Sequence, residues 1–308
     1  MADRATSDVR ERTDASAATA ARTGDDSSIV LWGPPGSGKS TYLATLVYYN
    51  ESLDEQARRW CVLPADGVTA EWVVERVERW REGAPAPKSL HPEPQALSFR
   101  LYSLPPARAG LFARRPAAAH PEATLRFWDV PGETYTGEIP DAIVQQMVGA
   151  RGLLLVLDPG FDPPEGRERF YERFFLKTLG KLTFAMQRAR AAGTLPADGR
   201  DVLAGDNRLT IPVAICLSHL DEHPALREGD RVRLLRELFG DSAQLLEKWL
   251  TTWEVLPMSA TGVRPATTRG ATVDPQPELA AHPIAWLLDQ SRAPAGPSAA
   301  APRAFGGW

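Results

Sequence analysis

The stretch SSIVLWGPPGSGKSTYLATLVYYN, residues Ser27 to Asn50, decides the fold of this chain. The apolar run Ile29–Trp32 has the length of a buried strand, and a helical pattern runs from Lys39 to Tyr49. Between them, residues 33–40 fit the pattern G-x-x-x-x-G-K-[ST] in full. Because a strand precedes this loop and a helix follows it, a chance glycine-rich turn is the weaker interpretation.

The motif predicts a site that cradles phosphate groups. Its glycines let the backbone wrap closely around oxyanions, and successive N–H groups at the start of the helix point toward them. Lys39 would give a positive charge to the β and γ phosphates, and the hydroxyl of Ser40 would ligate Mg²⁺. The residues expected to contact nucleotide are Gly33, Pro34, Pro35, Gly36, Ser37, Gly38, Lys39, Ser40 and Thr41.

The overall composition is that of an ordinary globular protein. Hydrophobic residues make up 43% of the chain, and the formal charge of −4 gives no electrostatic reason to expect nucleic acid as a partner. No run approaches the ~20 apolar residues of a membrane-spanning helix, and the N-terminal segment lacks the apolar core of a secretion signal. Cys61 and Cys216 are expected to be buried free thiols, which fits a cytoplasmic protein.

One domain with a loose segment at each end is the expected organisation. Residues 1–27 mix acidic residues with arginines and contain a single large aliphatic side chain, so we expect disorder there. The domain would span residues 28–290, with a proline-rich insert at about 83–123. The segment 291–308 is rich in Ala, Pro and Gly and is expected to be a flexible tail.

Strands and helices are expected to alternate along most of this domain. Besides the opening pair, the predicted strands are 97–101, 125–130, 152–158, 213–217 and 253–256, and the predicted helices are 69–81, 139–148, 167–192, 231–239, 242–250 and 283–290. The strands 97–101 and 125–130 have no helix between them, so we expect them to be antiparallel neighbours. This order predicts an α/β fold, a P-loop NTPase three-layer sandwich with a mostly parallel sheet and one antiparallel strand.

Asp129 lies near the carboxyl end of the strand 125–130, in the sequence LRFWDVPGE. A carboxylate at that end, beside the strand that carries the phosphate loop, can complete the shell of Mg²⁺. Gly132 follows at the spacing D-x-x-G. Its amide could meet a γ-phosphate, and a glycine lets the segment move when that phosphate leaves. An acidic turn residue is the alternative for Asp129.

Taken in order, these motifs resemble those of a Ras-like GTPase domain of the translation-factor-related class. The resemblance runs from about Ile29 to Gly262 and rests on the phosphate loop, the D-x-P-G element, and the sequences LLLVLD, VAICLSHLD and MSATG. The DVPGE element, the proline-rich insert and the N-terminal tail resemble the bacterial double-GTPase (DO-GTPase) group, which is associated with multigene systems. The resemblance implies GTP and GDP as ligands, Mg²⁺ as the metal, and a protein effector or regulator as partner.

It also implies where the base would bind. The family's Asn-Lys-x-Asp motif corresponds here to SHLD at residues 218–221. Asp221 keeps the carboxylate that accepts hydrogen bonds from guanine, while Ser218 stands in for the asparagine and the imidazole of His219 for the lysine. Ser259-Ala260, in MSATG, match the last base-contacting loop, where a backbone amide would meet guanine O6. A turn or helix-capping acid is the alternative for Asp221.

Glu133 takes the place of the glutamine that orients the attacking water in many Ras-like enzymes. An ionised glutamate cannot donate a hydrogen bond to the transition state, although it could act as a general base, and a solvated turn glutamate is the alternative. With Lys39 as the other catalytic candidate, we expect slow intrinsic hydrolysis that a partner could accelerate.

The resemblance also implies a threonine in the family's first switch segment, between the first helix and the second strand. We do not place it: Thr69 and Ser89 are the candidates, and Thr69 equally suits a helix N-cap.

Two other functions stay open from the sequence. GPPGSGKST also occurs in ATP-using P-loop proteins, so an ATPase or small-molecule kinase is the first alternative. Against it, no arginine-rich lid stands out, and Val130 follows Asp129 where an AAA-type site has a second acid. The other alternative is an interaction protein with a structural nucleotide. Trp72, Trp80 and Phe112 could mark its partner surface, although core packing is the commoner use of such side chains.

Overall fold

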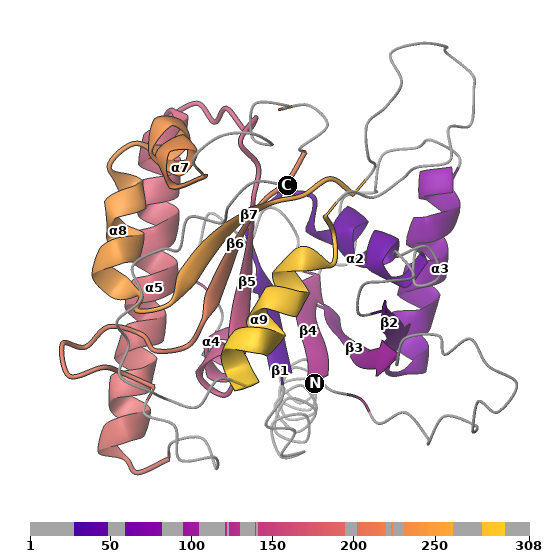
Figure 1. Cartoon of the computed structure of the whole chain (residues 1–308), viewed down its shortest axis with the longest axis horizontal. Helices are drawn as coiled ribbons and strands as arrows, with labels where there is room; N and C mark the ends of the chain where they lie inside the picture. The colour runs from indigo at the N-terminus through magenta and orange to yellow at the C-terminus, as the bar shows by residue number, and fades with distance from the viewer. Residues whose placement is uncertain are drawn as a thin grey trace, which may run out of the picture.

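The computed structural model describes residues 28–48, 59–81, 95–104, 121, 123–129, 139, 141–194, 202–219, 223, 231–260 and 279–292. They form a three-layer α/β fold in which one sheet lies between two groups of helices (Figure 1). The predicted α/β sandwich is therefore confirmed. The predicted tail at 1–27 and most of the one at 291–308 lie outside the described residues, but residues 291 and 292 are helical rather than loose.

The described part of the sheet has seven strands in the order β2-β3-β4-β1-β5-β6-β7. Their bounds are β1 Ser28–Trp32, β2 Arg59–Pro64, β3 Gln95–Leu104, β4 Ala123–Asp129, β5 Gly152–Leu157, β6 Val213–Leu217 and β7 Trp253–Pro257. β3 is antiparallel to both of its neighbours, whereas β4, β1, β5, β6 and β7 are parallel. The predicted antiparallel pair and the predicted sheet with one antiparallel strand are both confirmed.

Helices cover both faces of this sheet. Their bounds are α2 Lys39–Tyr48, α3 Gly67–Arg81, α4 Asp141–Val148, α5 Arg167–Ala191, α7 Arg231–Phe239, α8 Ser242–Trp249 and α9 His282–Arg292. α5, α7 and α8 lie on one side, and α2, α3 and α9 on the other (Figure 1). Strand β5 shows how the two layers arise. Leu153, Leu155 and Leu157 pack toward α4, α5, α7 and α8, while Leu154 and Val156 pack toward α2, α3 and α9, as the two-residue period of a strand requires.

β2 is an element that the sequence did not predict. Arg59–Pro64 pairs along its length with β3 and forms one edge of the described sheet. Cys61 lies on this edge strand and is only half-buried, which corrects the expectation that both cysteines are buried; Cys216, in central β6, is buried. Both are free thiols, and burial raises the pKa of each.

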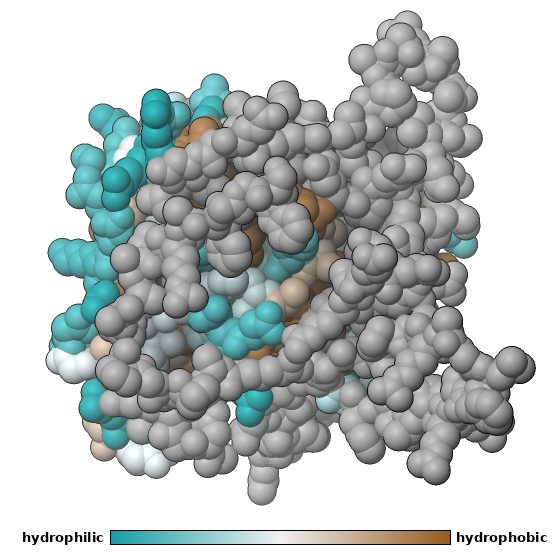
Figure 2. Space-filling model, in the orientation of Figure 1, coloured by the Kyte–Doolittle hydropathy of each residue, from teal (hydrophilic) through white to brown (hydrophobic). Residues whose placement is uncertain are grey.

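The outer sides of the helices on one face of the sheet are hydrophilic (Figure 2), as is usual for a surface that faces water. Hydrophilic residues gather over α5, α7 and α8 (Figure 2). Of the helices in the described ranges, none combines the length and apolar character needed to cross a membrane. Inside the predicted insert at 83–123, β3 is longer than expected, and the rest of the insert lies largely outside the described residues.

Candidate functional site

Five parallel strands bring most of the predicted site residues to one edge of the sheet, called here the carboxyl edge. The phosphate loop follows β1, and Asp129 ends β4. Ser218 and His219 follow β6, and Ser259-Ala260 come two residues after β7. Open α/β sheets bind their ligands at the carboxyl ends of their strands, so this convergence marks the candidate site.

The three glycines of the phosphate loop meet two different backbone demands. A Cβ on Gly33 would lie 2.2 Å from the carbonyl oxygen of Val156 in β5, so no larger residue fits without a shift of backbone. Gly36 and Gly38 have φ angles of 75° and 82°, in the left-handed region that side chains disfavour. The backbone conformation of this loop therefore requires glycine at positions 33, 36 and 38.

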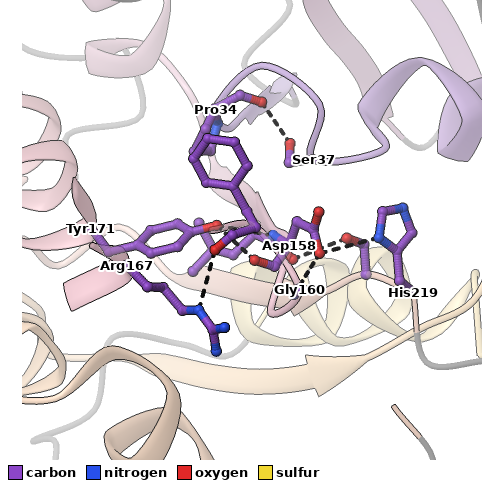
Figure 3. Close-up of polar contacts among 10 residues, drawn as sticks. Pro34, Ser37, Asp158, Gly160, Arg167, Tyr171 and His219 are labelled. Atoms are coloured by element: carbon purple, nitrogen blue, oxygen red, sulfur yellow. Dashed lines mark hydrogen bonds and ion pairs between the residues drawn. The ribbon is translucent and has the colours of Figure 1, made fainter. Parts of the chain in front are cut away.

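Lys39 opens α2, and its side chain turns back over the loop. Its Nζ donates to the carbonyl oxygen of Pro34 at 2.5 Å and to Oγ of Ser37 at 3.4 Å. Ser37 Oγ itself donates to Pro34 at 2.8 Å, a contact drawn in Figure 3. The residue is buried, and its charge lies where the helix N-terminus is also positive. An anion such as phosphate fits this place.

Ser40 and Asp129 are the predicted metal ligands. Ser40 is the second residue of α2 and is half-buried. β1 and β4 are paired so that Leu31 lies beside Phe127. Gly33 and Asp129 each come two residues later in the chain, so both lie at the carboxyl edge. A hydroxyl and a carboxylate are oxygen donors of the kind that Mg²⁺ prefers, so the residue types fit this ion. Within the described ranges, no cluster of three or more His, Cys, Asp or Glu could hold a metal.

Ser218 joins the end of β6 to the end of β5. Its N–H and its hydroxyl both donate to the carbonyl oxygen of Leu157, at 2.9 and 3.0 Å. The residue is buried, and its Cβ lies 3.7 Å from the position that a Cβ on Gly38 would take. Its hydroxyl proton is thus used within the sheet, and its side chain holds the end of β6 next to the phosphate loop.

His219 lies between β5 and the phosphate loop. Its φ of 57° is left-handed, a conformation that costs about 1–3 kcal/mol at a residue other than glycine. Nδ1 is 3.2 Å from Oδ1 of Asp158, and Nε2 is 3.5 Å from the Cβ position of Gly38. The imidazole, predicted to stand in for a lysine, therefore lies beside the phosphate loop.

Asp158, the residue after β5, belongs to the site although the sequence did not single it out. Its Oδ1 also accepts the N–H of Gly160 at 2.7 Å, and Figure 3 shows it between Tyr171 and His219. Burial raises the pKa of this carboxyl, but hydrogen bonds from His219 and Gly160 and the charges of His219 and His223 prevail, so the pKa lies below its ordinary value. A carboxylate directly after an aliphatic strand, at the carboxyl edge, was the signal that could have identified it.

The loop after β7 is tied to the helix that carries the phosphate loop. Ser259 is buried, and the hydroxyl of Thr45 in α2 donates to the carbonyl oxygen of Ala260 at 3.2 Å. One turn earlier in α2, the hydroxyl of Tyr42 donates to the carbonyl oxygen of Ala280 at 2.9 Å. α2 thereby fixes the predicted base-contacting loop relative to the predicted phosphate site.

Several predicted residues cannot be placed. Gly132, Glu133, Asp221 and Ser89 lie outside the described residues. Thr69 is buried, and its hydroxyl accepts the N–H of Ser98 at 3.1 Å, which joins α3 to β3. Its own N–H donates to Oδ1 of Asp66 at 2.7 Å, so Asp66 caps α3 and the N-cap alternative for Thr69 is wrong.

Comparison with known proteins gives structural similarity alone. No protein-family model and no curated protein matches the chain. Similar solved structures include the GTPase-like domain of S. cerevisiae Ski7 bound to GTP, at 12% identity over 86% of this chain and 50% of that one, with a TM-score of 0.41. The SRb-GTP/SRX complex of the signal recognition particle receptor from Chaetomium thermophilum is 16% identical over 78% of this chain and 93% of that one, with a TM-score of 0.35.

Sup35 complexed with GDP is 14% identical over 76% of this chain and 37% of that one, with a TM-score of 0.30. The match to Ski7 spans half the length of that chain. What this protein binds is therefore inferred from the residues of its own site.

Proposed function

We propose that this protein is a GTP-binding switch that hydrolyses GTP slowly with the help of Mg²⁺. The observation that carries the proposal is the shape of the phosphate loop. Gly36 and Gly38 are left-handed, Gly33 lies against the backbone of β5, and the ammonium of Lys39 is held on the loop at the start of α2. Such a loop at the carboxyl edge of a parallel sheet supports a nucleoside phosphate as the ligand.

Each part of the phosphate loop has a role toward that ligand. N–H groups of residues 36–41 would donate to phosphate oxygens, and the glycines let the backbone approach them. Lys39 would neutralise charge on the β and γ phosphates. Ser40 and Asp129 would hold Mg²⁺, which would supply positive charge that offsets the charge of the phosphates.

Guanine is the base that we propose. Asp221 would accept the N1–H and the exocyclic amine of guanine, a pair of donors that adenine does not present in that arrangement. The amide in the Ser259-Ala260 loop would meet O6, and this loop is held on α2 by Thr45. His219, whose ring lies beside the phosphate loop, would contact the nucleotide from the β6 side.

Slow hydrolysis follows from Glu133 in the proposed position beside the attacking water. An ionised glutamate there accepts hydrogen bonds but donates none to the transition state. Gly132 would sense the γ-phosphate and release the segment after hydrolysis. We further propose that a protein effector or regulator acts with the chain, in the cytoplasm and within a bacterial multigene system of the double-GTPase kind.

An ATP-binding P-loop protein is the second candidate. The observation that favours it is the hydroxyl of Ser218, which donates to Leu157 and so cannot donate a proton to the base as the family's asparagine amide can. If Asp221 also faced solvent, the guanine preference would have little support. The base is thus the part of the proposal that needs direct measurement.

Phosphate release tests the proposed activity. The purified chain is incubated with Mg²⁺ and GTP or ATP, and we expect GTP turnover on the order of 10⁻³ s⁻¹ or slower. Lys39→Ala should abolish it, and Lys177→Ala, an exposed lysine on α5, is the matched control. If Glu133→Gln and Glu133→Ala leave turnover unchanged, Glu133 has no catalytic role. Turnover of ATP but not of GTP would overturn the proposed function.

A further inference from the structure

The backbone of His219 is held in an unfavourable conformation by its surroundings. A φ of 57° at a histidine is sparsely populated, and such residues gather at functional sites. Here the preceding residue, Ser218, is fixed by two hydrogen bonds to Leu157, and the carbonyl oxygen of His219 accepts the N–H of His223 at 3.2 Å. The backbone constraints alone therefore restrict the direction in which the imidazole points.

The ring is fixed a second time through one of its nitrogens. Nδ1 lies 3.2 Å from Oδ1 of Asp158, so Nδ1 is the nitrogen that carries hydrogen. In a neutral imidazole this leaves Nε2 as an acceptor, and in a protonated one Nε2 is a second donor. The carboxylate therefore decides which edge of the ring is presented to the rest of the site.

Asp158 is itself rigidly placed. Oδ1 accepts the N–H of Gly160 at 2.7 Å, and the side chain is only 15% exposed. Its backbone is held by Tyr171, a buried residue of α5 whose hydroxyl donates to the Asp158 carbonyl at 2.9 Å and accepts the Asp158 N–H at 3.2 Å. The following loop is tied down as well, because Arg167 donates to the carbonyl oxygen of Phe161 at 3.2 Å.

The other edge of the ring faces the phosphate loop. Nε2 is 3.5 Å from the position that a Cβ on Gly38 would take, so the ring lies close to this glycine, which carries no side chain of its own. Gly38 directly precedes Lys39 and accepts the first helical hydrogen bond of α2, from Tyr42 at 2.8 Å. A series of contacts thus runs from Tyr171 in the core through Asp158 to the imidazole, which lies beside the turn that would bind phosphate.

We propose that Asp158 is a positioning residue that fixes the tautomer and orientation of His219 and, through it, sets the affinity for the nucleotide. The affinity part rests on the proposed function. An exposed carboxylate–imidazole pair with no further role contributes little to a protein. This pair instead combines a left-handed backbone, a mostly buried carboxylate and a ring that lies beside the phosphate loop.

The tautomer is measured without any ligand. Long-range proton–nitrogen NMR spectra distinguish the two neutral imidazole tautomers, and His219→Ala identifies the signals of this ring among the five histidines. We expect the Nδ1–H form in the wild type and in Asp158→Asn, whose side-chain oxygen can still accept. Asp158→Ala should shift the ring toward the Nε2–H form. Asp162→Asn, at an exposed carboxylate of the same loop, should change nothing.

Nucleotide affinity is measured next with a double-mutant cycle on GDP binding in the presence of Mg²⁺. Asp158→Ala and His219→Ala should each weaken binding about tenfold, the loss of one hydrogen bond that Nε2 of the fixed ring accepts from the nucleotide. The double variant should be no weaker than either single one, because Asp158 acts through the ring. Asp158→Asn should bind within about threefold of the wild type, since one hydrogen bond of ordinary strength remains.

Each outcome decides the matter. Losses that multiply in the double variant, an Asp158→Ala protein with wild-type affinity, or an Asp158→Asn protein as weak as Asp158→Ala would overturn the inference. Should Asp158→Ala not fold, Asp158→Ser replaces it, since a serine hydroxyl can accept from Gly160 but is too short to reach the ring. A wild-type chain that binds no guanine nucleotide would overturn the proposed function and the affinity part, while the tautomer spectra would still test the positioning by themselves.

Discussion

The two halves of the candidate site are built in different ways. The phosphate half, residues 33–41 with Asp129, takes its shape from backbone: left-handed glycines, a close approach to Val156 and hydrogen bonds to the carbonyl of Pro34. The half proposed to hold the base includes Asp158, Ser218, His219 and Ser259-Ala260 among the described residues. It depends on side chains from strands far apart in the sequence.

This difference explains why the phosphate half fits the pattern G-x-x-x-x-G-K-[ST] in full. A backbone cradle needs glycines at fixed spacing, so its sequence has little freedom. A side-chain pair such as Asp158 with His219 leaves more freedom in residue type, provided that the two partners lie within reach of each other. We therefore expect substitutions in the phosphate half to have the larger effects.

The largest expected effect is on binding, at Lys39. Lys39→Ala removes the only loop side chain with a positive charge, and with it charge-assisted hydrogen bonds to phosphate that contribute about 1.5–3 kcal/mol each. Affinity for GTP should fall by about 100-fold or more, measured by calorimetric titration. Lys177→Ala should bind like the wild type. A Lys39→Ala protein within threefold of wild-type affinity would show that this loop is not the phosphate site.

Gly33→Ala should have the next largest effect, on stability. The new Cβ would lie 2.2 Å from the carbonyl oxygen of Val156, and a strand backbone cannot yield as a flexible side chain can. We expect a loss of about 1–3 kcal/mol in the free energy of unfolding, the usual range for overpacking. Gly205→Ala is the matched control, because its Cβ would meet nothing within 4 Å. Equal stability of the two variants in urea would contradict the close approach.

Tyr171→Phe should weaken nucleotide binding, because it removes a buried hydroxyl that holds Asp158. It removes the hydroxyl that bridges the N–H and the carbonyl of Asp158, at a cost of about 1 kcal/mol for a buried hydrogen bond. GDP affinity should fall by a few-fold through displacement of Asp158, and His219→Ala should cancel that part of the effect. Were affinity to fall equally in the His219→Ala background, Tyr171 would act by another route.

The smallest expected effect is a pH dependence. Because the pKa of Asp158 is lower in the folded chain than its ordinary value of 3.8, the unfolded chain takes up this proton first as the pH falls. The stabilisation is therefore complete above about pH 5 and is lost as the pH drops through the folded pKa. In denaturation series from pH 6 to pH 3, the stability difference between wild type and Asp158→Asn should shrink. A constant difference would contradict the lowered pKa.

Much of this fold could be predicted because its signals are local. The aliphatic run at residues 153–157 and the glycine-rich loop each carry their meaning within a few residues, and both are where the sequence placed them. β2 was missed because RWCVLP is short, lies at the edge of the described sheet and pairs with a strand more than thirty residues later. Asp66 was not identified as the N-cap of α3 because Thr69, three residues later, also has a side-chain oxygen that can cap a helix.

The sequence predicted which residues lie at the site better than it predicted the contacts between their side chains. Asp158 gains its role from the register of β5 with β6, which places Leu157 beside Leu217 and so brings the residues after both strands together. No spacing in the sequence reveals that register. Ser218 was expected at the base, yet its hydroxyl is bonded to Leu157, a contact that depends on the same pairing.

The central claim is that a guanine nucleotide occupies this site. The direct test is competition at neutral pH with Mg²⁺, in which GDP and ADP displace a fluorescent guanine nucleotide from the wild-type chain. A base site that uses hydrogen bonds discriminates strongly, so GDP should compete at concentrations at least about 100-fold lower than ADP. Equal competition by the two nucleotides, or stronger competition by ADP, would contradict a GTP switch.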